Sequence, residues 1–219
     1  MLEWLGDVTC CRMTGFAAGV IGLLAVILPG AVYQGRDGEK YSVLNHFISE
    51  LGERGVSRWA WIFNLCIFLC GVAVMVATVS LGLGLPGFWA KLGLLFGVVT
   101  GVGMMMIGIF QMDNIKPHAT AAVTFFRGGL LMVSAFSLAI LFPPQNAITL
   151  PRPIGLVGLI PFAAFTVFLI LLWNERDQVD RTLSVEGVQH PKISKFTISE
   201  WAVFFSIILW TLVLSLAIG

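Results

Sequence analysis

The amino-acid sequence predicts an all-α protein, a polytopic transmembrane bundle of six helices that forms a single domain over residues 1–219. Hydrophobic residues make up 58% of the chain and charged residues only 11%, whereas about a quarter of the residues in soluble domains are charged. Apolar runs of about 20 residues, enough to cross a bilayer core of about 30 Å, recur along the chain. Because these runs do not alternate as barrel strands do, they predict helices.

Each predicted span is bounded by residues that suit a membrane interface. The runs are residues 13–33, 59–83, 91–112, 119–142, 153–173 and 198–218. Residues of the interfacial types lie near their first positions, in chain order Arg12, Trp59, Lys91, Pro117, Arg152 and Lys195. We therefore expect a multi-pass integral protein of the plasma or cytoplasmic membrane.

The third predicted span carries Gly93, Gly97 and Gly101 at four-residue spacing. One face of this helix lacks side chains, so a neighbouring helix can approach it closely. These glycines are the expected helix–helix contacts, and packing within the bundle is favoured over a dimer seam. The chain shows no internal repeat of the kind that builds transporters from inverted halves.

The connections between spans are unequal. With six spans, residues 34–58, 113–118 and 174–197 share one side of the membrane, and they hold most of the charged residues. Their excess of Lys and Arg favours a cytoplasmic location for this polar face. All histidines of the chain lie there: His46, His118 and His190.

The first connection contains the segment YSVLNHFISELGERG, which predicts a short amphipathic helix capped by Ser42. Its apolar positions are Leu44, Phe47, Ile48 and Leu51, and its opposite face presents Asn45, His46, Ser49, Glu50 and Glu53. One interpretation is an interfacial helix with a solvated polar face. The other is a functional cluster in which His46 and Glu50, one turn apart, share a proton or a metal ion.

A second candidate cluster lies between the third and fourth spans, where Asp113 and His118 flank a short loop. The loop brings both side chains to the same rim as His46 and Glu50. Together these groups contain the imidazoles and carboxylates that a divalent metal would use. The alternative is that Asp113 and His118 cap helix ends and bond to loop backbone.

Two polar residues fall within predicted spans. Arg127 lies nine positions after His118, about 13 Å further along a helix, where a charge needs a partner. Glu50, Asp113 or a lipid phosphate could serve, and snorkelling to the polar rim is the competing interpretation. Asn64 in the second span more often bonds to a neighbouring helix than to a ligand.

Several classes of function are disfavoured. The formal charge of +1 gives no clustered basic surface, so no nucleic-acid partner is expected. Histidine pairs within spans are absent, which argues against haem, and the sequence has no Walker loop, G-x-S-x-G elbow or HExxH motif. The sequence assigns no cofactor.

The segments YSVLNHFISELG, WIFNLCIFLCG and GIFQMDNIKPHATAAVTFF together resemble the family of domain of unknown function 998 over about residues 20–215. The loop residues Ile48, Ser49, Glu50 and Gly52, with His118, also look distantly similar to the superfamily of GPI-anchor remodelling and autophagy-modulator membrane proteins. The resemblance implies six helices, one site that combines the loop and His118, and action on or near lipids. It also implies cytoplasmic termini, opposite to the charge count.

A weaker similarity concerns the intramembrane zinc hydrolases of the alkaline ceramidase group. Ser42 and His46 match their Ser-x-x-x-His element, and Asp113 could match a second ligand. The seventh helix and the paired histidines of that group are missing.

The leading hypothesis is a lipid-associated membrane protein whose polar face binds the head group of a membrane lipid, with Arg127 as anion partner. If the site is catalytic, a rim histidine is the general base and Asp113 orients it. The alternatives are a non-catalytic scaffold or accessory membrane subunit and an intramembrane metal-dependent lipid hydrolase. The candidate catalytic residues are His46, Asp113 and His118, and the candidate ligand-binding residues are Ser49, Glu50, Asn64 and Arg127.

Overall fold

The computed structural model describes residues 3–145, 150–174 and 191–218. Six helical stretches in these ranges are long and apolar enough to cross a membrane, which confirms the predicted bundle and a multi-pass integral membrane protein. The spans are α1 (Val8–Ala31), α2 (Ala60–Gly84), α3 (Phe88–Ile109), α4 (Ile115–Leu141), the consecutive α5 (Arg152–Val157) and α6 (Leu159–Asn174), and α8 (Lys195–Ala217). Short 3-10 helices, η1 (Glu3–Gly6) and η2 (Ile48–Gly52), complete the described elements.

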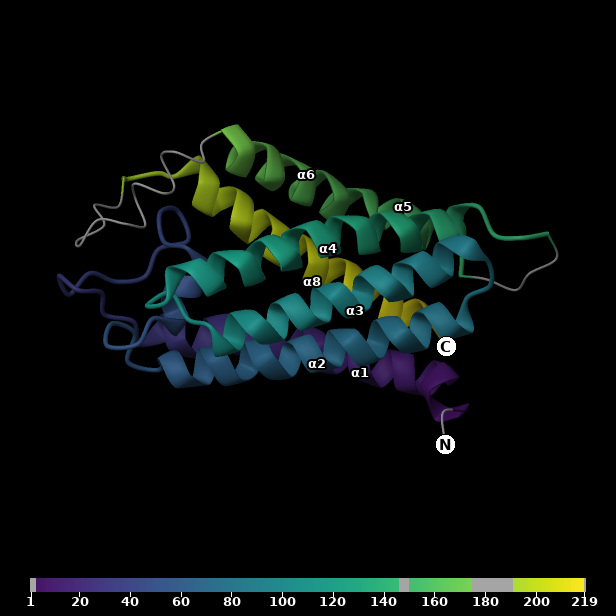
Figure 1. Cartoon of the computed structure of the whole chain (residues 1–219), viewed down its shortest axis with the longest axis horizontal. Helices are drawn as coiled ribbons and strands as arrows, with labels where there is room; N and C mark the ends of the chain where they lie inside the picture. Colours follow the sequence, from purple (N-terminus) through teal and green to yellow (C-terminus); the bar gives the residue numbers. More distant parts are fainter. Residues whose placement is uncertain (1–2, 146–149, 175–190, 219) are drawn as a thin grey trace.

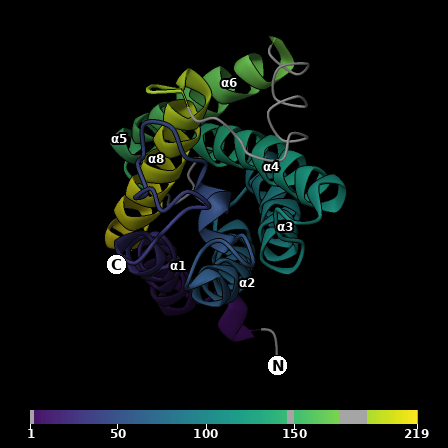
Figure 2. The ribbon, with the colours of Figure 1, turned by 90° about the vertical axis from the view of Figure 1, so that its left-hand side faces the viewer.

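The helices run up and down and form a ring. Neighbours in sequence pack on one another from α1 to α4, α4 packs on α6, α6 on α8, and α8 returns to α1. Figure 2, seen from the end that carries the longer connections, shows the helices around a centre, with the loop that follows α1 in front. Both chain ends lie at the opposite end of the bundle (Figure 1).

The close contact between α2 and α3 depends on glycine. A Cβ atom added at Gly101 of α3 would lie 2.8 Å from the carbonyl oxygen of Gly71 in α2, closer than any side chain could stand. Gly97 also faces α2, whereas Gly93 faces α4. The glycine face predicted for the third span is therefore occupied by helices of the same chain.

Exposed aromatic side chains lie at both ends of the bundle. Trp61 near the start of α2 and Trp173 near the end of α6 lie at the polar end, and Phe88, Trp89 and Phe142 lie at the opposite end. Tryptophan, whose ring is amphipathic, concentrates at the two membrane interfaces. Trp61 and Trp173 at one end and Trp89 at the other fit a bilayer that spans the length of α2 and α3.

The helix in the first connection is shorter than the sequence pattern indicates. Helical backbone begins at Ile48, after the N-cap residue Phe47, while residues 43–46 form a turn and leave Leu44 exposed. The segment lies over the end of the bundle, where Ile48 and Leu51 are buried. The side-chain amide of Asn64 donates to the Gly52 carbonyl at 2.9 Å and holds η2 against α2. Packing on the bundle, rather than an amphipathic surface, thus decides the length of this helix.

Candidate functional site

A cavity of about 130 Å³ lies inside the ring of helices. Its walls come from α1, α2, α3, α4 and α8, and η2 contributes at one end. Along α8 and its C-cap residue the lining residues run from Glu200 to Ile218, about 27 Å at the α-helical rise. The cavity is therefore long and narrow and follows the helix axes for most of a bilayer core.

The walls of the cavity are apolar, although several of them carry hydroxyl groups. Each of these hydroxyls donates to a carbonyl one turn earlier in its own helix, at 2.7 to 2.9 Å. The residues concerned are Thr78, Thr100, Thr211 and Ser215. Because their hydrogens are already used within the helices, they add little polarity to the wall.

The polar groups of the cavity gather at the end covered by the first connection. Ser49 of η2, His118 of α4 and Glu200 of α8 all line it there. Glu200 and Ser49 are partly buried, and His118 is buried. The cavity therefore has one polar end and one apolar end.

Glu200 connects α8 to the covering loop, which is the connection between α1 and α2 (residues 32–59). Its Oε2 accepts a hydrogen bond from the backbone N–H of Ile48 at 2.9 Å. The preceding amide, of Phe47, donates to Oε1 of Glu50 at 2.7 Å. Two carboxyl groups from distant parts of the chain thus bind consecutive amides, which places Glu50 beside the polar end of the cavity.

His118 has a defined hydrogen position. Its Nδ1 lies 2.8 Å from the carbonyl oxygen of Phe110, the last residue before the α3–α4 loop. Because a carbonyl can only accept, Nδ1 carries the hydrogen in this bond and the neutral ring keeps Nε2 as an acceptor. The bond also ties the start of α4 to the end of α3. Here Phe110 performs the orienting role that the sequence suggests for Asp113.

Ser49 faces both the cavity and the loop between α3 and α4. Its hydroxyl lies 3.1 Å from the sulfur of Met112, a weak acceptor. Its partial exposure to the cavity leaves the oxygen able to accept a hydrogen bond.

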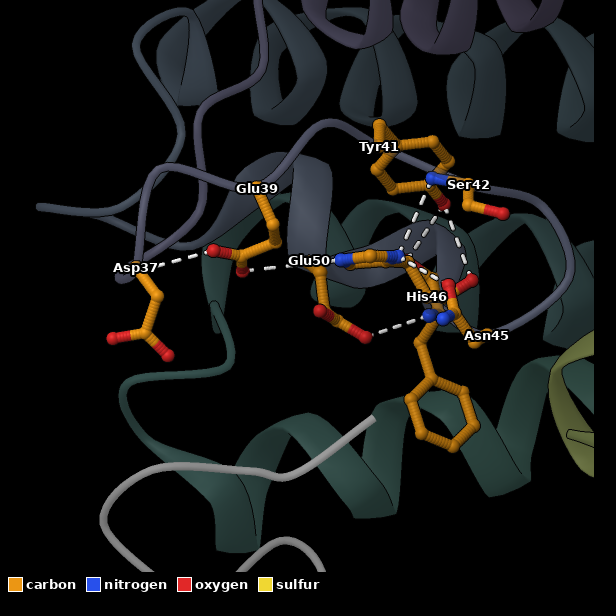
Figure 3. A network of polar contacts seen from close by, with 8 residues as sticks. Asp37, Glu39, Tyr41, Ser42, Asn45, His46 and Glu50 are labelled. Atoms are coloured by element: carbon orange, nitrogen blue, oxygen red, sulfur yellow. Dashed lines mark hydrogen bonds and ion pairs between the residues drawn. The ribbon is translucent and has the colours of Figure 1, made fainter. Parts of the chain in front are cut away.

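His46 belongs to the covering loop, where Figure 3 shows it beside Tyr41, Asn45 and Glu50. It is not among the residues that line the cavity. It is 2% exposed, its Nδ1 lies 2.7 Å from the Asn45 side-chain oxygen, and its Nε2 lies 4.0 Å from Glu39. The ring packs against Tyr33 and Tyr41. These contacts hold the covering loop in its observed conformation.

Hydrogen bonds from Tyr41 and from Ser194, at the start of α8, hold the covering loop in place. The Tyr41 hydroxyl donates to the Phe47 carbonyl at 2.8 Å. Burial raises the pKa of Tyr41, and the nearby Glu200 and Glu50 carboxyl groups raise it further, so the phenol stays a neutral donor. The Leu44 carbonyl accepts from the Ser194 amide at 2.8 Å. The cover is thereby bonded to the helix that carries Glu200.

The other sequence candidates lie outside the cavity. Asp113 is exposed in the α3–α4 loop, and Asn64 has the structural bond to Gly52 already described. Arg127, for which the sequence leaves both a carboxylate or phosphate partner and snorkelling to the polar rim open, is exposed on the outer side of α4 and forms no ion pair within the described ranges. His190 lies outside the described residues. The structure thus places Ser49 and His118 at the polar end of the cavity with Glu50 beside it, and leaves Asp113 and Arg127 exposed outside it.

Glu200 is not predicted from the sequence as a site residue. It is the third residue of the predicted sixth span and, like Arg127, an ionisable group within a span. Its proximity to the helix end makes it look like a boundary residue. Among the described residues, no group of three or more His, Cys, Asp and Glu side chains is placed to hold a metal ion.

Comparison with protein-family models gives a match to the family described as a protein of unknown function, DUF998, over residues 16–217. The chain belongs to the DUF998 family. The match begins within α1 and extends to the end of α8, so it covers most of the residues that line the cavity. Neither a curated protein nor a solved structure matches the chain.

Proposed function

We propose that this DUF998 protein binds a membrane lipid inside the bundle, with the hydrocarbon chain in the cavity and the head group at Ser49, His118 and Glu200. The observation that carries this proposal is that a long, apolar cavity has polar side chains at one of its two ends. A molecule that fills such a space must itself be long, apolar and polar at one end.

The length of the cavity, rather than its volume of about 130 Å³, supports an acyl-type chain. Its length along α8, about 27 Å, compares with a hydrocarbon core of about 30 Å, so a chain lying along the helix axes stays within the membrane. A lipid chain is already surrounded by hydrocarbon, so the hydrophobic effect contributes little to its transfer. Affinity must then come from close packing along the walls and from hydrogen bonds at the polar end.

The site is proposed for binding and not for catalysis. His118 is oriented by a backbone carbonyl, while Asp113, its expected carboxylate partner, is exposed in a loop. A binding role needs only the acceptors that face the cavity. It also places the proposed head group at the cavity end on the polar face.

Native mass spectrometry of the protein purified in mild detergent, with lipid extraction, tests the proposal. Ala122 lines the cavity one helical turn after His118, so Ala122→Trp should fill it just below the polar end. The matched control is Ala119→Trp, because Ala119 is exposed on the same helix. We expect bound lipid on the parent and on Ala119→Trp, and its loss from Ala122→Trp.

Circular dichroism and size-exclusion chromatography establish that both tryptophan variants are folded before they are compared. Equal lipid content in the two folded variants would show that lipid binds elsewhere and would overturn the proposal. Ala122→Val is a smaller change on the same face and should give an intermediate loss if the larger substitution does not fold.

A further inference from the structure

We infer that the lipid bound in the cavity carries a protonated amine, so that the ligand class is a long-chain alkylammonium. The inference rests on the proposed function and specifies the head group that the polar end selects. The observations that carry it are the acceptor atoms and the carboxyl group at that end of the cavity.

The polar end presents acceptors toward the cavity. One oxygen of Glu200 binds the Ile48 amide, which leaves its second oxygen for a ligand. His118 uses its ring N–H on Phe110, which leaves Nε2 as an acceptor. An ammonium group has three donors and no acceptor, which matches the acceptor character of these two groups and of the Ser49 oxygen.

The carboxyl group at this end also favours a cationic ligand, because a bound ammonium stabilises its ionised form. Glu200 is the only Asp, Glu, Lys or Arg among the described residues that line the cavity. A carboxylate withdrawn from water in the membrane is unfavourable unless a positive charge or hydrogen bonds compensate it. Arg127 is turned away on the outer side of α4, so within the described ranges the cavity contains no side-chain cation that could do so.

Other head groups fit these atoms less well. A phosphate or carboxylate head group brings a negative charge and further acceptors against Glu200 and Nε2 of His118. A hydroxyl head group can donate one hydrogen bond but brings no positive charge to stabilise the ionised form of Glu200. The expected order of affinity is therefore amine first, alcohol second, and both anions last.

The experiment measures binding of hexadecylamine, hexadecanol, hexadecanoate and hexadecyl phosphate to the purified, delipidated full chain in a non-ionic detergent. The readout is displacement of a fluorescent alkylamine probe. We expect hexadecylamine to bind at least about tenfold more tightly than either anion, as for a hydrogen bond between charged groups. Glu200→Gln should abolish most of this preference while its amide oxygen still accepts from Ile48.

Asp37→Asn is the matched control, because Asp37 is exposed on the same polar face and its change removes the same charge. It should leave the amine preference unaltered. Equal binding of the amine and the anions, an alcohol that binds as tightly as the amine, or an unchanged preference in Glu200→Gln would each overturn the inference. Binding of every probe without discrimination leaves the lipid cavity intact and defeats only the head-group inference. If Ala122→Trp binds all of the probes as the parent does, the cavity itself is not the site.

Discussion

The contact between α2 and α3 and the space between α4 and α8 show two ways in which apolar helices assemble in one bundle. At Gly71 and Gly101 the backbones of α2 and α3 approach so closely that no side chain fits between them. Helices α4 and α8 instead present large or polar side chains to the interior, and both pack on α6. Because lipid supplies little hydrophobic drive between helices, the size of the side chains at the interface decides which arrangement forms. The first arrangement brings the helices into close contact, and the second leaves a cavity between them.

The largest expected effect on stability comes from placing a large side chain in the glycine contact between α2 and α3. Gly101→Leu would place a side chain against the Gly71 carbonyl and Met75, and it should destabilise the fold by at least the roughly 1–3 kcal/mol typical of overpacked interiors. Unfolding in mixed micelles measures the change. Val102→Leu is the control, because Val102 is 38% exposed beside it and should change stability little. Equal stability of the two variants would contradict the assignment of this contact as the main constraint.

A smaller effect is expected at the cover of the polar end. Asn64→Ala removes the hydrogen bond to the Gly52 carbonyl and leaves that carbonyl without this partner, at a cost of about 1–3 kcal/mol. The loss should appear as faster hydrogen exchange of the amides in residues 48–52, with the amides of α2 and α3 protected as before.

Asn114→Ala is the control for this change, because Asn114 is an exposed asparagine on the same face. Uniform loss of protection throughout the bundle in Asn64→Ala would mean that the cover and the glycine contact unfold together. That outcome would remove the distinction between the two regions.

The smallest effect is expected at Arg127. Its side chain is exposed on the outer side of α4 and does not line the cavity. Arg127→Gln should therefore change the free energy of unfolding by about 0.5 kcal/mol or less and leave the bound lipid unchanged. A loss of lipid comparable to that in Ala122→Trp would place Arg127 in the binding site and restore the sequence-based hypothesis of an anionic head group.

Part of the candidate site could be predicted from the sequence. The resemblance of the loop residues and His118 to a membrane superfamily implies one combined site, and the structure does place Ser49 and His118 at the polar end of the cavity with Glu50 beside it. Glu200 could not be assigned to it from sequence distance, because it lies 152 positions from the amide that it binds. His46 and His118 are the same residue type on the same polar face, and only packing separates the one that holds the cover from the one that faces the cavity.

The amino-acid sequence by itself determined that the protein lies in a lipid bilayer, how many spans it has, which end of the bundle is polar, and which glycines lie at helix contacts. These properties depend on composition and on local spacing, which the bilayer thickness and helical geometry convert directly into structure. The tertiary structure alone decided which side of each helix faces inward. Spans that are apolar all round give no periodic signal for the buried side, so the outward position of Arg127 and the inward position of Glu200 follow from the packing of the complete ring.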